Sequence, residues 1–171
     1  MAQEQNDAGS LPAEVDPQNA LVLDTGAGRI VIKLRTDVAP AHAERLKQLA
    51  REGFYDDVPF HRVIEGFMAQ TGDGQHGNGT GGSSYPDLRA EFSDLPFERG
   101  TVGMARKGGN NHSANSQFFI MFDEGSFLNG EYTVIGEVVA GMDAVDKLKR
   151  GEPPANPDRI IRIQVAADAQ P

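Results

Sequence analysis

The sequence predicts a mainly β protein, an antiparallel barrel or sandwich that carries two helices. About seven or eight short strand-like segments lie along the chain, separated by Gly, Asn, Asp and Pro, whereas only two segments have helical periodicity. A doubly wound α/β sheet would need a helix between most of its strands, so that class is excluded. The chain has 171 residues, a length typical of one domain, because domains usually contain about 100 to 200 residues.

A hairpin and a helix are expected at the start of the fold. Residues 21–23 are apolar and precede a glycine-bearing turn, after which apolar residues alternate with Arg and Lys as far as residue 35. Residues 39–51 then carry apolar side chains at helical spacing. Pro40 lies near the beginning of this segment and Gly53 beyond its end, which is typical of helix boundaries.

The rest of the chain predicts further strands and a second helix. Strands are expected at residues 60–64, 67–70, 101–105, 117–122, 133–139 and 159–165. Helical periodicity returns at residues 142–149. The sequence has no internal repeat and no linker between two cores. One domain is therefore expected at residues 20–166, with a flexible acidic leader at 1–19 and a short tail at 167–171.

The composition excludes several classes of protein. The chain has 16 Lys and Arg against 25 Asp and Glu, and its net charge of -9 disfavours nucleic acids and anionic membranes as partners. It has no cysteine, which excludes disulfides and thiolate chemistry. The longest apolar run, residues 118–122, is far shorter than the about 20 residues that span a bilayer. Residues 1–19 lack Lys, Arg and the apolar run of a secretory signal, so a cytoplasmic protein is expected.

The sequence indicates no cofactor. Its four histidines stand outside the usual metal motifs, and the Gly-x-Ser-x-Gly motif of many hydrolases does not occur. The glycine-rich segment at residues 73–84 lacks the Gly-Lys-Ser/Thr of a phosphate loop and the strand and helix that flank a dinucleotide loop. We therefore expect neither a metal nor a nucleotide, and we interpret residues 73–84 as an ordered loop that backs a neighbouring site.

Alternation along three of the strands gathers unusual side chains. Side chains of a strand point alternately to its two faces, so Met68 and Gln70 share one face, as do Gln117 and Phe119. If these strands are neighbours of the strand that holds Arg62, the five side chains form one half-apolar patch with a fixed cation. Taken singly, Arg62 also fits an ordinary surface position and Phe119 an ordinary core position.

Several motifs together resemble those of the cyclophilin peptidyl-prolyl isomerases, in order and in spacing. They are Phe60-His61-Arg62-Val63-Ile64-Glu65-Gly66-Phe67-Met68-Ala69-Gln70, Gly72-Asp73, Gly77-Asn78-Gly79-Thr80-Gly81-Gly82, Ser116-Gln117-Phe118-Phe119-Ile120 and Gly136-Glu137-Val138. The similarity covers about residues 20–166, and the short loops resemble those of compact bacterial members. It implies a closed eight-stranded antiparallel barrel capped by two α-helices, and an enzyme that catalyses rotation about X–Pro peptide bonds during protein folding.

The resemblance also implies roles for individual residues. Arg62 would be the catalytic residue, supported by Gln70, with Phe119 beside them. The pocket for the proline ring would be formed by Phe67, Met68, Phe119 and Leu128, with Phe127 and Tyr132 at its rim. The remaining substrate contacts would come from Gln117, from the backbone at Ala105 and Arg106, and from Gly79 in the adjoining groove.

Departures from the better-known eukaryotic pattern affect ligand preference. Phe127 stands where those members have tryptophan, and Tyr132 where they have histidine. Thr71 replaces a glycine, and residues 106–112 differ in length and charge from the usual run. We therefore expect weak binding of cyclosporin, a monomer, and proline-containing peptides and folding proteins as partners. The alternative is a non-catalytic module that binds proline segments or acts as a chaperone.

Overall fold

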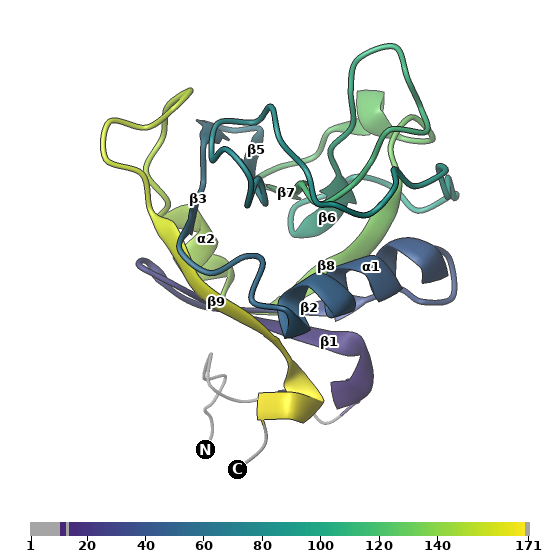
Figure 1. The fold of residues 1–171 in the computed structure, drawn as a ribbon, viewed down its shortest axis with the longest axis horizontal. Coiled ribbons are helices and arrows are strands. Elements are labelled where there is room, and N and C mark those ends of the chain that lie inside the picture. Colours follow the sequence, from purple (N-terminus) through teal and green to yellow (C-terminus); the bar gives the residue numbers. More distant parts are fainter. Residues whose placement is uncertain (1–10, 13, 170–171) are drawn as a thin grey trace.

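One curled antiparallel sheet dominates the computed structural model, which describes residues 11–12 and 14–169. In order across the sheet, its nine strands in the described residues are β3 (Val58–Pro59), β9 (Arg159–Val165), β1 (Ala20–Thr25), β2 (Gly28–Leu34), β8 (Val134–Ala140), β6 (Thr101–Met104), β7 (Phe118–Met121), β5 (Met68–Thr71) and β4 (Arg62–Ile64). The two outermost strands, β3 and β4, are consecutive in the chain and separated by two residues. The sheet must therefore curl back on itself, and Figure 1 shows β1, β2 and β9 on one side of it and β5, β6 and β7 on the other.

The predicted fold class is confirmed, with a difference in the number of strands. Only Arg62 to Ile64 of the segment expected to be a strand at residues 60–64 form one, β4, which pairs with β5. The residues before that segment, Val58 and Pro59, form a further short strand that was not predicted and that pairs with β9. Pro59 has no N–H for a second ladder, and the N–H of Phe60 is donated to the carbonyl of Asp158. No ladder joins β3 to β4 in the described residues, so the chain itself, rather than hydrogen bonds, completes the curl.

The predicted hairpin is formed by β1 and β2. Its turn is organised by Thr25, whose Oγ1 accepts from the N–H groups of Ala27 at 3.0 Å and Gly28 at 3.1 Å and donates to the carbonyl of Gly28 at 2.7 Å. Alternate side chains of both strands, including Leu23 and Ile30, are fully buried in the main core. The alternation of the sequence thus fixes which face of the hairpin enters the main core, while Val22 on the opposite face is buried in a smaller cluster.

Helix α1 (Pro40–Arg51) packs against β9 and begins one residue later than the predicted helix at residues 39–51. It buries Leu46 and Leu49 in the main core. Its N-cap residue, Ala39, has no side chain that can accept a hydrogen bond. Glu91, from the long segment between β5 and β6, takes that role, because its carboxylate accepts the N–H groups of Ala41 at 3.2 Å and His42 at 3.0 Å.

Helix α2 (Met142–Asp146) is shorter than the segment at 142–149 predicted from the periodicity. It packs against β2. Its last turn tightens, since the N–H of Leu148 bonds to Val145, three residues back. The carbonyls of Asp146 and Leu148 instead accept from the guanidinium of Arg150, at 2.9 and 2.6 Å. The side chain of Arg150 therefore ends the helix.

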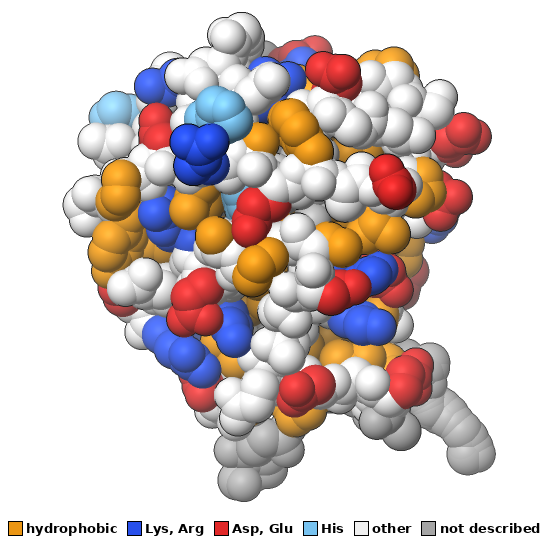
Figure 2. Space-filling view, turned by 90° about the vertical axis from the view of Figure 1, so that its right-hand side faces the viewer, with side chains coloured by type: hydrophobic (Ala, Val, Ile, Leu, Met, Phe, Trp, Pro, Cys, Tyr) orange, Lys and Arg blue, Asp and Glu red, His pale blue; other side chains and the backbone are white. Residues whose placement is uncertain are grey.

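The predicted leader and tail lie partly outside the described residues, at positions 1–10, 13 and 170–171. Within the described part, the short 3-10 helix η1 (Pro17–Asn19) is capped by Asp16, and Val15 is buried against Val22 and Ala166. No helix of the described residues is long and apolar enough to cross a membrane. Acidic and basic side chains are interspersed on the face in Figure 2, so that face has no continuous basic surface for a nucleic acid.

Candidate functional site

The residues predicted to carry the chemistry form one row across three neighbouring strands. Register pairs Arg62 of β4 with Gln70 of β5, and Gln70 with Phe119 of β7. Directly paired residues point to the same face of a sheet, so their three side chains lie together, as the alternation predicts. Their neighbours along the chain, such as Ala69 and Ile120, point to the opposite face and belong to the main core.

Beside this row lies a cavity of about 350 Å³. Ten of the twelve predicted site residues line it: Arg62, Phe67, Met68, Gln70, Gly79, Ala105, Arg106, Phe119, Leu128 and Tyr132. Gln117 and Phe127 do not. The sequence analysis missed three lining residues, His61, Asn78 and Thr80. All three belong to the recognised motifs, so their position in the sequence could have suggested them.

The floor of the cavity is apolar and belongs to a second, smaller core. Phe119 is 5% exposed. Its ring stacks on Phe97 at 5.8 Å between centroids and meets Tyr132 edge-on at 5.8 Å. Gly103 permits this stack, because a Cβ there would lie 2.6 Å from the ring of Phe97 and 2.7 Å from the ring of Phe119. Met68 and Leu128, both buried, complete the floor.

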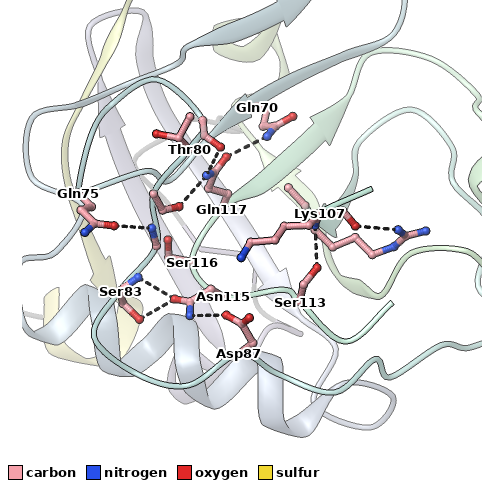
Figure 3. A pocket seen from close by; sticks show the side chains of 15 residues that line it. Gln70, Gln75, Thr80, Ser83, Asp87, Lys107, Ser113, Asn115, Ser116 and Gln117 are labelled. Carbon is pink, nitrogen blue, oxygen red and sulfur yellow. Dashed lines mark hydrogen bonds between the residues drawn. The ribbon is translucent and has the colours of Figure 1, made fainter. Parts of the chain in front are cut away.

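The polar side of the cavity is a chain of hydrogen bonds with a defined direction. The amide nitrogen of Gln117 donates to the carbonyls of Gly79 at 3.0 Å and Gly81 at 2.8 Å (Figure 3). Its Oε1 is therefore the acceptor for Nε2 of Gln70, at 2.9 Å. That contact leaves Oε1 of Gln70 directed toward Arg62, whose Nη1 donates to it at 3.4 Å.

The glycine-rich loop is ordered by one buried carboxylate. Asp73 is 1% exposed. It accepts hydrogen bonds from five backbone N–H groups, those of Gln75, His76, Asn78, Gly79 and Gly81. Burial opposes its ionisation, but the backbone donors outweigh that effect and lower the pKa of Asp73 to about 2. The loop backs the cavity, as predicted.

His61 lies against the glycine loop and lines the cavity with it. It is 6% exposed, and a Cβ at Gly79 would lie 3.0 Å from its Nε2. Burial lowers the pKa of His61, and the nearby charge of Arg62 acts in the same direction, against the opposing effect of Asp73. The imidazole is therefore favoured in its neutral form, so the positive charge at this side of the cavity comes from Arg62.

A second cavity of about 470 Å³ continues from the first. The two share Gln70, Gly79, Thr80, Ala105 and Arg106. The walls of the second are polar and come from the glycine loop and from the segment before β7; they include Gln75, Ser83, Asp87, Lys107, Ser113, Asn115 and Gln117 (Figure 3). Because they share these lining residues, the two cavities form one continuous groove with an apolar end and a polar end.

Two residues at the rim differ in how they are held. Phe127 is 70% exposed, and its ring lies 5.6 Å from that of Phe67 without lining the cavity. Arg106 lies 4.3 Å from the ring centroid of Tyr132, and its Nη2 donates to the carbonyl of Glu131 at 3.0 Å. The cation–π contact holds both side chains of this second pair over the cavity edge.

An acidic neighbour of Arg62 was also missed. Nε of Arg62 lies 3.1 Å from Oε1 of Glu152, a residue 90 positions away in the sequence. No local pattern of the sequence could have indicated this pair. In the described part of the chain, no group of three His, Cys, Asp or Glu side chains is arranged to hold a metal ion.

Comparison with known sequences finds relatives over nearly the whole chain. Residues 20–165 match the family described as "Cyclophilin type peptidyl-prolyl cis-trans isomerase/CLD". A protein of Brucella suis named as a probable peptidyl-prolyl cis-trans isomerase is 56% identical over 170 residues, which cover 91% of this chain and 86% of that one. Peptidyl-prolyl cis-trans isomerase B of Escherichia coli is 43% identical over 133 residues, covering 73% of this chain and 80% of that one.

Solved structures of similar fold agree with the sequence relatives. A cyclophilin from Hirschia baltica has a TM-score of 0.84 at 28% identity and covers 92% of this chain and 77% of that one. A cyclophilin type peptidyl-prolyl cis-trans isomerase from Cryptosporidium parvum, crystallised in the presence of the dipeptide Ala-Pro, has a TM-score of 0.79 at 26% identity. That match covers 85% of this chain and 98% of the other.

Proposed function

The chain belongs to the cyclophilin-type peptidyl-prolyl cis-trans isomerases, and we propose that Arg62, Gln70 and Phe119 carry its reaction on proline-containing peptides. The observation behind these roles is the row of three side chains at the wall of a half-apolar cavity. The Ala-Pro dipeptide present with the relative from Cryptosporidium parvum supports the same class of substrate. Proteins in the course of folding would supply such segments.

The reaction needs no covalent bond to the enzyme. Rotation about the X–Pro bond breaks amide resonance, a barrier of about 18–20 kcal/mol. In the twisted bond the proline nitrogen becomes pyramidal and regains its lone pair. An N–H of Arg62 directed at this nitrogen makes a hydrogen bond that the planar ground state cannot accept. Arg62 thus binds the transition state more strongly than the substrate, which is the requirement for catalysis.

The apolar floor supplies the remainder of the catalysis. A hydrogen bond to a charged group contributes about 1.5–3 kcal/mol, which corresponds to an acceleration of about tenfold to hundredfold at about 1.36 kcal/mol per factor of ten. Phe119, Met68 and Leu128 would hold the proline ring while the rest of the peptide turns. This contact favours a partly twisted peptide and lowers the barrier further.

The groove would hold the peptide on both sides of the proline. The N–H of Ala105 is already donated to the carbonyl of Gln117 at 3.0 Å, so we assign the backbone contact with substrate to the carbonyl of Ala105. Both amide hydrogens of Gln117 are used by loop carbonyls. Gln117 can therefore meet a substrate only through the second lone pair of Oε1. Its main contribution would be to orient Gln70.

Exchange NMR on a short X–Pro peptide tests the proposal. The wild-type protein should accelerate cis–trans exchange, and Arg62→Ala should lower that acceleration about a hundredfold, the strong end of a charge-assisted hydrogen bond. The peptide's affinity should change much less. A folded Arg62→Ala protein with the wild-type exchange rate would refute the role of Arg62. A wild-type protein that shifts peptide resonances without accelerating exchange would instead be the non-catalytic binding module.

Three further expectations are part of the proposal. They are a monomeric state, cytoplasmic localisation and weak binding of cyclosporin. The last is supported by the phenylalanine at position 127, which has no hydrogen-bond donor in its ring.

A further inference from the structure

A carboxylate stands directly beside the side chain to which we assign the reaction. Glu152 lies in the segment between α2 and β9, and its Oε1 accepts from Nε of Arg62 at 3.1 Å. Both side chains are partly exposed, Arg62 by 44% and Glu152 by 57%. Exposed ion pairs of this kind contribute little to folding stability. The position of Glu152 therefore needs another explanation than stability.

The backbone places Glu152 opposite Arg62. Val63 and Gly151 exchange two backbone hydrogen bonds, each 2.8 Å long, in an isolated antiparallel bridge. In antiparallel pairing the residue after Gly151 faces the residue before Val63, so Glu152 faces Arg62. Gly151 has a φ of 143°, and a Cβ there would lie 2.6 Å from Cα of Pro154. The bridge thus depends on a glycine at this position.

The chain before the bridge is also held firmly. Arg150 donates from Nε to Glu65 at 2.8 Å, and its guanidinium lies 4.2 Å from the ring centroid of Phe122. The same side chain donates from Nη1 to the carbonyls of Asp146 and Leu148. Glu152 is therefore presented to Arg62 from a segment with side-chain anchors as well as a backbone bridge.

The guanidinium of Arg62 donates hydrogen bonds to two side chains. Nε is held by Glu152, and Nη1 by Oε1 of Gln70, itself oriented by Gln117. Within the described residues, Nη2 of Arg62 makes no hydrogen bond. A planar guanidinium that is held at Nε and Nη1 cannot rotate freely, so its remaining N–H groups keep one direction relative to the cavity.

We propose that Glu152 is a positioning residue for the isomerase reaction. Its carboxylate holds Nε of Arg62, so that the free N–H groups stay directed at the bond that rotates. The inference rests on the proposed role of Arg62 and extends it to a residue that touches no substrate. Orientation is what converts a flexible charged side chain into an effective transition-state donor, and small displacements of catalytic groups cost large factors in rate.

Variants of Glu152 separate positioning from simple charge. Glu152→Ala should lower the catalysed exchange rate about three- to tenfold, which is less than the rate loss that a fully misplaced catalytic group causes. The peptide's affinity should stay within about twofold of the wild type. Glu152→Gln keeps an oxygen that can accept from Nε, so it should restore most of the rate. A matched control exists in Asp168, whose Oδ2 accepts from Nε of Arg51 at 2.9 Å with exposures of 44% and 46%. Asp168→Ala should leave the rate unchanged.

NMR of the arginine side chain gives a readout independent of activity. The Nε–Hε signal of Arg62, assigned by its absence from Arg62→Lys, should exchange slowly with water in the wild type and fast in Glu152→Ala. Glu152→Gln should lie between them. The proposal is overturned if Glu152→Ala keeps the wild-type rate, or if its rate falls while the Arg62 signal is unchanged. If Arg62→Ala is fully active but the Arg62 signal still depends on Glu152, the role of Arg62 in catalysis fails and the contact stands.

Discussion

The two faces of β4, β5 and β7 have different tasks, although the same backbone carries both. On one face Val63, Ala69 and Ile120 are at most 1% exposed and belong to the main core with the helices. On the other face, one residue along, Arg62 and Gln70 remain partly exposed at the cavity wall. The inner face stabilises the fold, and the outer face uses the resulting rigidity to hold polar groups in fixed directions.

This division teaches why the site can be built on short strands. A side chain on a rigid strand keeps its direction without a dedicated support, because the pairing of β4 with β5 and β5 with β7 fixes its neighbours. Where a group is long and flexible, as in Arg62, additional contacts are made by Gln70 and Glu152. Changes on the two faces should therefore have separable effects.

The largest effect on stability is expected from the inner face. Ile120→Ala removes a fully buried side chain and leaves a cavity, which should lower the free energy of unfolding by about 3 to 4 kcal/mol. The catalysed rate per folded molecule should stay within about twofold of the wild type. Urea titration and exchange NMR on the same preparation measure both. A loss of rate as large as the loss of stability would mean that the faces are not separable.

Gly103→Ala should lower stability and catalysis together, because it disturbs the aromatic stack under the outer face. The added Cβ would meet the rings of Phe97 and Phe119 at 2.6 and 2.7 Å. Overpacking of this kind costs about 2 to 3 kcal/mol, and moving Phe119 should also reduce catalysis. Gly108→Ala is the matched control, because a Cβ there meets nothing within 4 Å. Equal thermal stability and activity of the two variants would contradict the role of the aromatic stack.

Protonation of Asp73 in the glycine loop should lower the folding stability of the protein at acidic pH. The pKa of Asp73 is about 2 in the folded protein against 3.8 for the free side chain. The ionised carboxylate therefore stabilises the fold fully above pH 3.8, and this contribution, about 2 kcal/mol, is lost as the pH falls through 2. Asp73→Asn should flatten that part of the stability profile. Asp94→Asn, at an exposed position, is the control and should leave it unchanged.

The smallest effect is expected at the rim. Phe127 is 70% exposed and contacts Phe67. Phe127→Trp adds ring area and an N–H donor, which should tighten binding of cyclosporin by about 1 to 2 kcal/mol with little change in the catalysed rate. Calorimetric dissociation constants for the two proteins check this. Tight binding already present with Phe127, or no gain with tryptophan, would show that this position does not control the drug's affinity.

Local patterns of the sequence predicted the elements whose causes are local. The hairpin and α1 follow from alternation and from helical spacing next to Pro40, and the row of site residues follows from period two. The two-residue strand β3 was missed because its pairing depends on β9, about a hundred residues later. Glu152 was missed for the same reason, since a backbone bridge to Val63 brings it to Arg62. Contacts between distant segments leave no periodic signal in either partner.

The extent of α2 shows a second limit of sequence patterns. Apolar spacing indicates a helix as far as residue 149, but the helix ends at Asp146. The side chain of Arg150 donates hydrogen bonds to carbonyls that, in a longer helix, would accept from backbone N–H groups of the next turn. Periodicity indicates which residues are buried. It does not indicate whether a backbone N–H or a side chain donates to a given carbonyl, and so it does not fix the end of a helix.

The separation of the two faces is tested most directly by measuring Arg62→Ala for catalysis and stability on one sample. Exchange NMR should show a catalysed rate about a hundredfold lower, whereas equilibrium unfolding should give a free energy within about 1 kcal/mol of the wild type, because the ion pair that is lost is exposed. An unchanged rate would contradict the account. So would a rate that falls only in proportion to the fraction of unfolded protein.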